Sequence, residues 1–160
     1  MSAGNVSIKI HSVFQVRGTH LVIDHDGGRI LEGVADGAVF VTVRANPKLW
    51  SETAIFITFD EGGGYWDSGY VQPLDFFGDG TRIPLLIVSP YTRGGHISHS
   101  YGDHVSILKF IEANWGLPPI THRSRDNFPN PRVDWRNPYV PENSPALSDL
   151  MDAFSFDNHR

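Results

Sequence analysis

Two short runs of apolar residues stand out against the mixed pattern of the rest of the chain. Residues 54–59, AIFITF, are apolar at every position except Thr58, and residues 83–88, IPLLIV, are apolar throughout. A strand has this composition when helices cover both faces of its sheet. Pro84 is tolerated near the start of a strand. We therefore predict two buried strands, at 54–59 and 83–88.

Apolar residues at helical spacing mark residues 104–115, HVSILKFIEANW. One stripe of this segment is predicted to face the core; it consists of Val105, Leu108, Ile111 and Trp115. Asp103 is expected to cap the amino end of the helix, and Gly116 is expected to stop it.

A last helix is predicted over residues 145–154, with Ser144 as its cap and Pro145 in its first turn. Its inward-facing residues would be Leu147, Leu150, Met151 and Phe154. Residues 120–143 are rich in Pro, Asn and Arg and have no periodicity, so they are predicted to form a long surface loop.

The amino-terminal part of the chain has a less definite pattern. Short β-like runs occupy residues 6–16 and 20–23. Residues 30–45 combine residues that favour strands, such as Val41 and Val43, with apolar positions at helical spacing. We predict a helix there, closed by Asn46-Pro47. Apolar strands that alternate with helices imply an α/β layered fold with a mostly parallel sheet and flanking helices.

Composition narrows the class of protein. The chain has 160 residues, of which 40% are apolar, and its net charge is −5. This balance argues against a nucleic-acid partner or a polybasic membrane surface. The absence of cysteine excludes disulfides and thiolate metal sites. We expect no transmembrane segment, since no apolar run is long enough, and the first twenty residues do not have the pattern of a signal peptide.

Candidate chemistry lies where the first apolar strand ends. Asp60 and Glu61 follow it directly, and Gly62, Gly63 and Gly64 come next. In open α/β sheets, ligands bind beyond the carboxyl ends of the strands, and glycine allows close approach of the backbone. Adjacent carboxylates repel each other unless they share a cation or a proton. The pair would therefore suit a hard divalent cation, and the alternative is a solvated acidic turn.

Histidines form a second group of candidates. His25 lies between two aspartates, which would keep it charged and suited to a phosphate, or it is an ordinary loop histidine. His96 and His99 have a spacing that would hold a metal, but the glycines around them favour surface residues. His104 opens the predicted helix, near the positive end of the helix dipole. The sequence assigns no firm role to His96, His99 or His104.

Three blocks of this sequence resemble the carboxyl-terminal part of the phosphoesterase family, which includes bacterial non-haemolytic phospholipases C, acid phosphatases and plant non-specific phospholipases C. The blocks are LWSETAIFITFDEGGGYWD, then GTRIPLLIVSPYTRGGHISHSYGDHVSILKFIEANWGL, then ALSDLMDAFSF. They place the family portion at residues 21–157 and leave residues 1–20 as a non-family extension. The resemblance implies an alkaline-phosphatase-like layered sandwich, here incomplete.

The resemblance also implies a function and its residues. The family hydrolyses phosphate esters, and its Asp-Glu pair serves a divalent metal cation; the matching residues are Asp60 and Glu61. A family histidine that lines the site matches His25, although Asp26 replaces the proline that follows it in the family. His104 matches a segment that supports the site. The substrate would be a phosphate ester or a phospholipid, and the full-length enzyme would be secreted or periplasmic.

One departure from the family pattern matters for activity. Family members carry a Glu-Asn metal-binding pair and a Ser or Thr nucleophile before the Asp-Glu block, and nothing in this chain aligns with either. The chain is therefore expected to be a carboxyl-terminal fragment that lacks the amino-terminal part of its domain and has little activity alone. Two alternatives stay open: a non-catalytic remnant or cation-binding scaffold of the same fold, and a two-carboxylate glycosidase.

Overall fold

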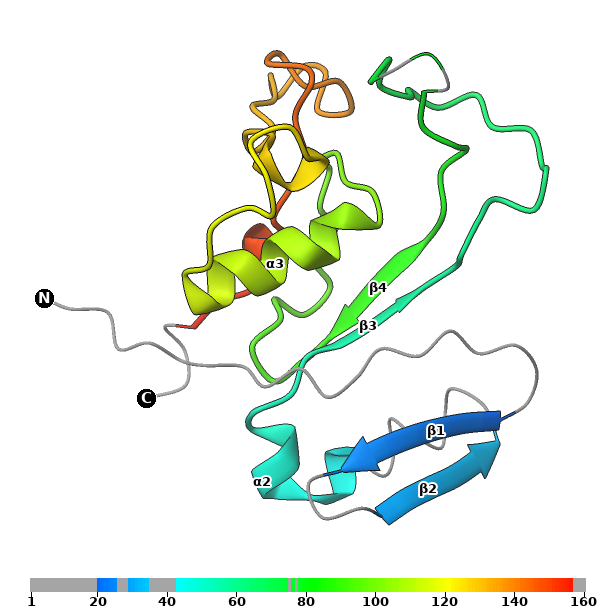
Figure 1. Ribbon diagram of the computed structural model, residues 1–160, viewed down its shortest axis with the longest axis vertical. Coiled ribbons are helices and arrows are strands. Elements are labelled where there is room, and N and C mark those ends of the chain that lie inside the picture. The colour runs from blue at the N-terminus through cyan, green and yellow to red at the C-terminus, as the bar shows by residue number, and fades with distance from the viewer. Residues whose placement is uncertain (1–19, 26–28, 35–42, 75, 77, 157–160) are drawn as a thin grey trace, which may run out of the picture. The chain divides into compact units, whose positions relative to one another are not determined.

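The computed structural model describes residues 20–25, 29–34, 43–74, 76 and 78–156. The chain divides into two compact units, and Figure 1 labels the helices and strands. The first comprises Met1–Asp60 with Leu85–Tyr91, and the second comprises Glu61–Pro84 with Thr92–Arg160. In the described part of the chain, the helices are all too short or too polar to cross a bilayer.

An antiparallel hairpin opens the described part of the first unit. Strand β1 (His20–His25) pairs with β2 (Arg29–Val34) in a register that runs from His20 opposite Val34 to His25 opposite Arg29. The expected strand at 20–23 is confirmed, whereas residues 6–16 lie outside the described residues.

The predicted helix over 30–45 is wrong in its first part. Residues 30–34 belong to β2, because cross-strand pairing with β1 overrides the helical spacing of their apolar side chains. Residues 43–45 are helical, and 35–42 lie outside the described residues. A further helical turn, α2 (Pro47–Trp50), follows; Asn46 caps it by accepting a hydrogen bond from the Leu49 amide at 3.2 Å.

The two predicted apolar strands are confirmed in position, but they run in opposite directions, and their residues are half-buried or exposed where buried strands were expected. Strand β3 (Ile55–Thr58) pairs antiparallel with β4 (Leu85–Val88), so both sheets of the described residues are antiparallel and two-stranded. The expected mostly parallel sheet is therefore not found in this part of the chain. Parallel pairing needs a crossover, usually a helix, and residues 59–84 contain no helical segment where they are described.

The second unit is organised around helix α3 (Val105–Trp115), as the sequence predicts. Gly116 ends it in the left-handed conformation, with φ of 64°. Asp103 accepts a hydrogen bond from the Val105 amide at 2.7 Å, although the residue at the cap position itself is His104. The predicted inner stripe is wrong: the buried residues are Ser106, Lys109, Phe110 and Glu112, and Trp115 is exposed.

The ammonium group of Lys109 shows how polar side chains of α3 can be buried in the second unit. Lys109 Nζ donates to the carbonyl oxygens of Phe128 and Leu147 and to Asn130 Oδ1. These three acceptors satisfy all three N–H groups of the lysine. Burial lowers the pKa of Lys109, while nearby carboxylates oppose that shift. The lysine thus connects α3 to two segments that are distant in sequence.

The predicted helix over 145–154 is also wrong. Its backbone amides bond to other segments: the amide of Leu147 donates to the Pro129 carbonyl, and that of Ser148 to the Tyr101 carbonyl. Leu150 has φ of 59°, which no α-helix accommodates. Only a 3-10 turn, η2 (Met151–Ala153), is helical. The loop predicted over 120–143 is confirmed as irregular, apart from the 3-10 turn η1 (Arg125–Asn127).

The apolar core of the second unit lies between α3 and this irregular carboxyl-terminal segment. Its buried members are Phe110, Ala146, Leu147, Leu150 and Phe154, so three of the four residues expected to face inward do so. The rings of Phe110 and Phe154 stack with their centroids 4.9 Å apart. A small core of this kind carries much of the stability of the unit.

Hydrogen bonds fix the loop of residues 61–84 to the rest of its unit. The side chain of Gln72 is completely buried; its Nε2 donates to the Ala146 carbonyl at 2.7 Å and its Oε1 accepts from the Ala146 amide at 2.9 Å. Asp79 accepts from Arg125 Nη1 at 2.6 Å and from the Tyr101 hydroxyl at 2.8 Å. These contacts give a loop without regular structure a defined conformation.

Tyr101 is expected to ionise at a higher pH than an ordinary tyrosine side chain. Burial, together with its hydrogen bond to Asp79, raises the pKa of Tyr101 from 10.0 to about 12. Because the unfolded tyrosine ionises first, this group contributes stability below pH 10.0, and that contribution is lost as the pH rises to about 12. Absorbance at the tyrosinate band should show a late phase that Tyr101→Phe removes. A Tyr91→Phe control should leave that phase in place.

Candidate active site

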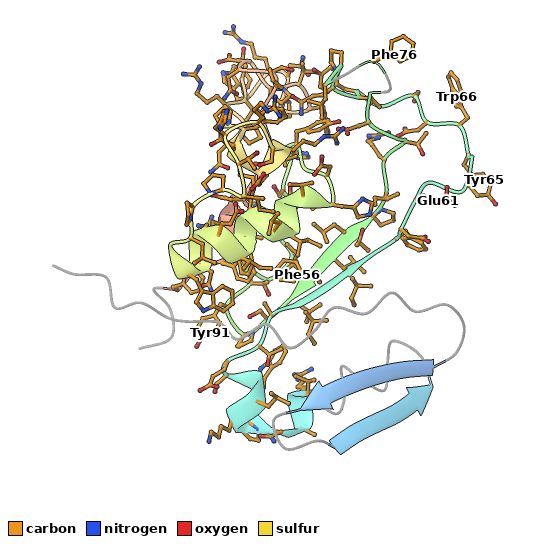
Figure 2. The ribbon with its side chains drawn as sticks, in the orientation of Figure 1. Phe56, Glu61, Tyr65, Trp66, Phe76 and Tyr91 are labelled. Carbon is orange, nitrogen blue, oxygen red and sulfur yellow. The ribbon has the colours of Figure 1, made fainter. Side chains whose placement is uncertain are left out.

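The acid pair follows β3 as the sequence predicts, and both acids are exposed. Asp60 and Glu61 lie just beyond Thr58, the last residue of the strand, and Figure 2 labels Glu61 at this position. Glu61 Oε2 accepts a hydrogen bond from the Gly63 amide at 2.9 Å. Gly63 and Gly64 have φ of 67° and 74°, so the glycine run is required by the left-handed backbone of this turn.

The donor atoms of this pair fit a divalent cation in kind but not in number. Carboxylate oxygens are the ligands that hard cations prefer, and such cations take about six of them in proteins. Within the described ranges, however, His, Asp and Glu form no group of three that would hold a metal ion. Further ligands would have to come from outside the described residues or from water.

His25, the histidine assigned to the phosphate by family resemblance, is the last residue of β1, opposite Arg29 in the hairpin. This places its backbone at the end of a strand that belongs to the same unit as Asp60. Its contribution to the site stays a prediction.

The other three candidate histidines, His96, His99 and His104, lie in the second unit and are exposed. His96 is part of a turn in which its amide donates to the Arg93 carbonyl at 3.1 Å. His99 packs edge-to-face against Tyr139, with 5.0 Å between ring centroids. His104 begins α3. Among the residues that the structure describes, His96 and His99 have no third ligand beside them. Their exposure agrees with their interpretation as surface residues.

The loop that follows the acid pair contains an ion pair that was not predicted from the sequence. Asp67 binds Arg82 through two parallel contacts: Arg82 Nη2 lies 2.7 Å from Oδ1, and Nε lies 2.8 Å from Oδ2. The amides of Gly69 and Arg82 also donate to this carboxylate, at 2.9 and 2.8 Å. Hydrogen bonds from Arg82 hold the pKa of Asp67 far below its usual value, and Asp67 in turn raises the pKa of Arg82.

This ion pair joins the two ends of the loop that begins at Glu61. Gly69 lies under the Arg82 guanidinium, and Gly62 lies against the Thr81 side chain, so a Cβ at either glycine would collide with these groups. Gly62, Thr81 and the ion pair border an open hollow of about 400 Å³. Its lining consists of Gly62, Tyr65, Trp66, Asp67, Thr81, Arg82, Ile83 and Pro84. Figure 2 shows Tyr65 and Trp66 projecting from the loop, and they are 81% and 91% exposed.

Loss of the Asp67–Arg82 pair is expected to loosen this loop without unfolding the chain. Asp67→Asn removes the charge that Arg82 contacts, so chymotrypsin should cleave after Tyr65 or Trp66 several times faster than in the wild type. The same loosening should occur in the wild type as the pH falls below 3.8, the ordinary pKa, toward the lowered one. Asp152→Asn, which removes contacts to Ser98 and Ser100 elsewhere in the unit, is the control. Equal cleavage of both variants would contradict this role.

Comparison with known proteins gives one family and several relatives. The profile of the Phosphoesterase family matches residues 19–118. A non-hemolytic phospholipase C of Burkholderia pseudomallei is 32% identical over 145 residues, which cover 74% of this chain and 19% of the relative. Phospholipase C B of Mycobacterium tuberculosis is 33% identical over 98 residues, covering 46% of this chain and 19% of the relative. Non-specific phospholipase C1 of Arabidopsis thaliana is 31% identical over 112 residues, covering 55% of this chain and 21% of the relative. The chain spans about a fifth of the length of each of these relatives.

Proposed function

Because the chain belongs to the phosphoesterase family, we propose that it supplies Asp60 and Glu61 to an enzyme that hydrolyses phosphoric esters. The position of both acids directly after an apolar strand, where layered α/β enzymes bind their ligands, is the observation that carries this proposal. The alkaline-phosphatase-like sandwich expected from the resemblance is the fold in which the pair would act.

The proposed substrate class is a phospholipid or a related phosphate ester. The similar proteins from Burkholderia, Mycobacterium and Arabidopsis are all named phospholipases C, which supports a lipid phosphodiester. Phosphate monoesters, the substrates of the acid phosphatases that the sequence also resembles, are the other choice within this class.

Asp60 and Glu61 would hold a divalent cation, whose identity we leave open. Such a cation, when bound, stabilises negative charge on phosphoryl oxygens. The two carboxylates would fix its position, and the left-handed glycine turn keeps the Glu61 side chain beside the backbone at 2.9 Å from the Gly63 amide. His25 would contact the phosphate or give a proton to the leaving group.

The hydroxyl nucleophile is expected to come from the amino-terminal part of the domain, which has no counterpart in this sequence. Activity of this chain by itself should therefore be very low, because loss of a nucleophile leaves only a residual rate. A non-catalytic scaffold of the same fold is the second candidate. It is favoured by the exposure of both acids and by the lack, in the described part of the chain, of a third metal ligand near them.

A chimera tests the proposed function directly. In it, the segment of the Burkholderia relative that matches this chain is replaced by the corresponding residues of this chain. We expect it to hydrolyse phosphatidylcholine or p-nitrophenyl phosphate and to be inhibited by vanadate. A folded chimera without phosphate-ester hydrolysis would favour the scaffold, and hydrolysis of glycosides in its place would favour the glycosidase alternative.

A further inference from the structure

The β3–β4 ribbon has apolar side chains on both of its faces. In an antiparallel pair, residues directly opposite each other project to the same face. One face therefore carries Ile55 and Ile57 with their partners Val88 and Leu86. The other face carries Phe56 and Thr58 with Ile87 and Leu85, so Thr58 is the only polar residue among the eight.

These side chains are incompletely covered in the chain by itself. The four residues of β3 are half-buried, Leu85 is 37% exposed, and Leu86 is 59% exposed. None of the eight appears among the buried residues of the described core. A strand pair with two apolar faces is normally covered on both sides, and a two-stranded ribbon of four residues per strand is marginally stable alone.

We propose that this ribbon is the docking surface for the remaining part of a phosphoesterase domain, present either in the same polypeptide or as a separate one. The length of the relatives identifies this occupant: about four fifths of each lies outside the segment that matches this chain. The occupant presents apolar side chains to the two faces of the ribbon and extends its sheet.

The composition of the ribbon supports a protein partner of this kind. None of its eight residues is charged, and seven are aliphatic or aromatic. Such a surface provides no group to pair with a charged ligand, whereas it matches the interior of a layered α/β domain. This inference rests on family membership and on the ribbon itself, and it does not depend on metal binding by the acid pair.

Co-expression tests the proposal. The partner is the Burkholderia relative from which the segment that matches this chain has been deleted, produced from one operon with an affinity-tagged form of the full chain. We expect the two to purify as a one-to-one complex. Two exposed leucines give a matched pair of variants, since Leu86 is 59% exposed and Leu117, outside the ribbon, is 53% exposed. Leu86→Asp should reduce recovery of the partner about tenfold or more, the loss expected of an interface anchor. Leu117→Asp should leave it unchanged.

Hydrogen exchange gives a second measurement that does not require the partner to fold alone. In the chain by itself, peptides that contain residues 55–58 and 85–88 should exchange much faster than those from α3, and in the complex they should become as protected as α3. Full protection of the ribbon in the monomeric chain would overturn the proposal, as would equal recovery of partner by Leu86→Asp and wild type. A dimer of the chain that Leu86→Asp dissociates, or binding to phosphatidylcholine vesicles that Leu86→Asp abolishes, would overturn it in favour of self-association or of a lipid surface.

The outcomes also separate this proposal from the proposed function. A complex that forms normally but hydrolyses no phosphate ester would leave the docking surface established and contradict the function. Hydrolysis by the covalent chimera, combined with no complex and a protected ribbon in the chain alone, would support the function and contradict the docking surface.

Discussion

Asp60→Asn, introduced into the chimera of this chain with its Burkholderia relative, is expected to lower kcat/KM for phosphate-ester hydrolysis on the order of a thousandfold. The change keeps the size of the side chain and removes the negative charge that would hold the cation. Protein stability should change little, because Asp60 is exposed.

Two companion variants make this result specific to the acid pair. Glu61→Gln should lower activity by a similar factor, although it keeps an oxygen that can accept from the Gly63 amide. Asp134→Asn is the control: its carboxylate accepts a local hydrogen bond from the Arg136 amide at 3.0 Å, and activity should be unchanged. If Asp60→Asn and Asp134→Asn had the same kcat/KM, the acid pair would have no role in the reaction.

Phe110→Ala is expected to lower the free energy of unfolding by about 3–5 kcal/mol, the range for an aromatic ring removed from a core. The ring of Phe110, a residue of α3, is completely buried and stacks on Phe154. Its loss therefore leaves a cavity that the neighbouring side chains fill only in part. Urea unfolding, monitored by circular dichroism, measures the change.

Leu117→Ala gives the comparison for this stability effect. Leu117 follows α3 and is 53% exposed, so its truncation should cost well under 1 kcal/mol. A loss at Phe110 no larger than that at Leu117 would show that the core of the second unit does not lie between α3 and the carboxyl-terminal segment.

Features set by local composition were predictable from the sequence. The apolar runs at 54–59 and 83–88 gave the positions of β3 and β4, and the spacing of apolar residues with Gly116 gave α3. The position of the acids beyond β3 also followed from the sequence. These are cases in which neighbouring residues determine the conformation.

Features set by long-range contacts were not predictable. Residues 30–34 have helical spacing but pair with β1, and residues 145–154 have a helical stripe but bond to Pro129 and Tyr101. The polar residues buried on α3 depend on acceptors up to 38 positions away, such as the Leu147 carbonyl that Lys109 contacts. The prediction of strand direction was wrong for a related reason. The direction of β4 relative to β3 depends on the path of residues 59–84 and not on the composition of either strand.

The site shows the same division. Asp60 and Glu61 were recognisable because they are adjacent and follow a strand, whereas Asp67 and Arg82 are 15 positions apart. Each occurs among glycines, where a charged residue is usually a solvated turn residue. Only the folded loop shows that they meet through two parallel hydrogen bonds. The signal available in the sequence was an aspartate and an arginine, of opposite charge, on either side of a segment that contains several glycines.

Cation binding by the acid pair is the claim on which the proposed function depends most. We would measure it by titrating Mn²⁺ into the metal-depleted chimera and recording the electron paramagnetic resonance signal of the free ion. Bound Mn²⁺ should reach a plateau in the wild-type chimera and be lost in the Asp60→Asn/Glu61→Gln double variant, with the fold of both preserved. Equal Mn²⁺ binding by the two proteins would contradict the assignment of these acids as metal ligands.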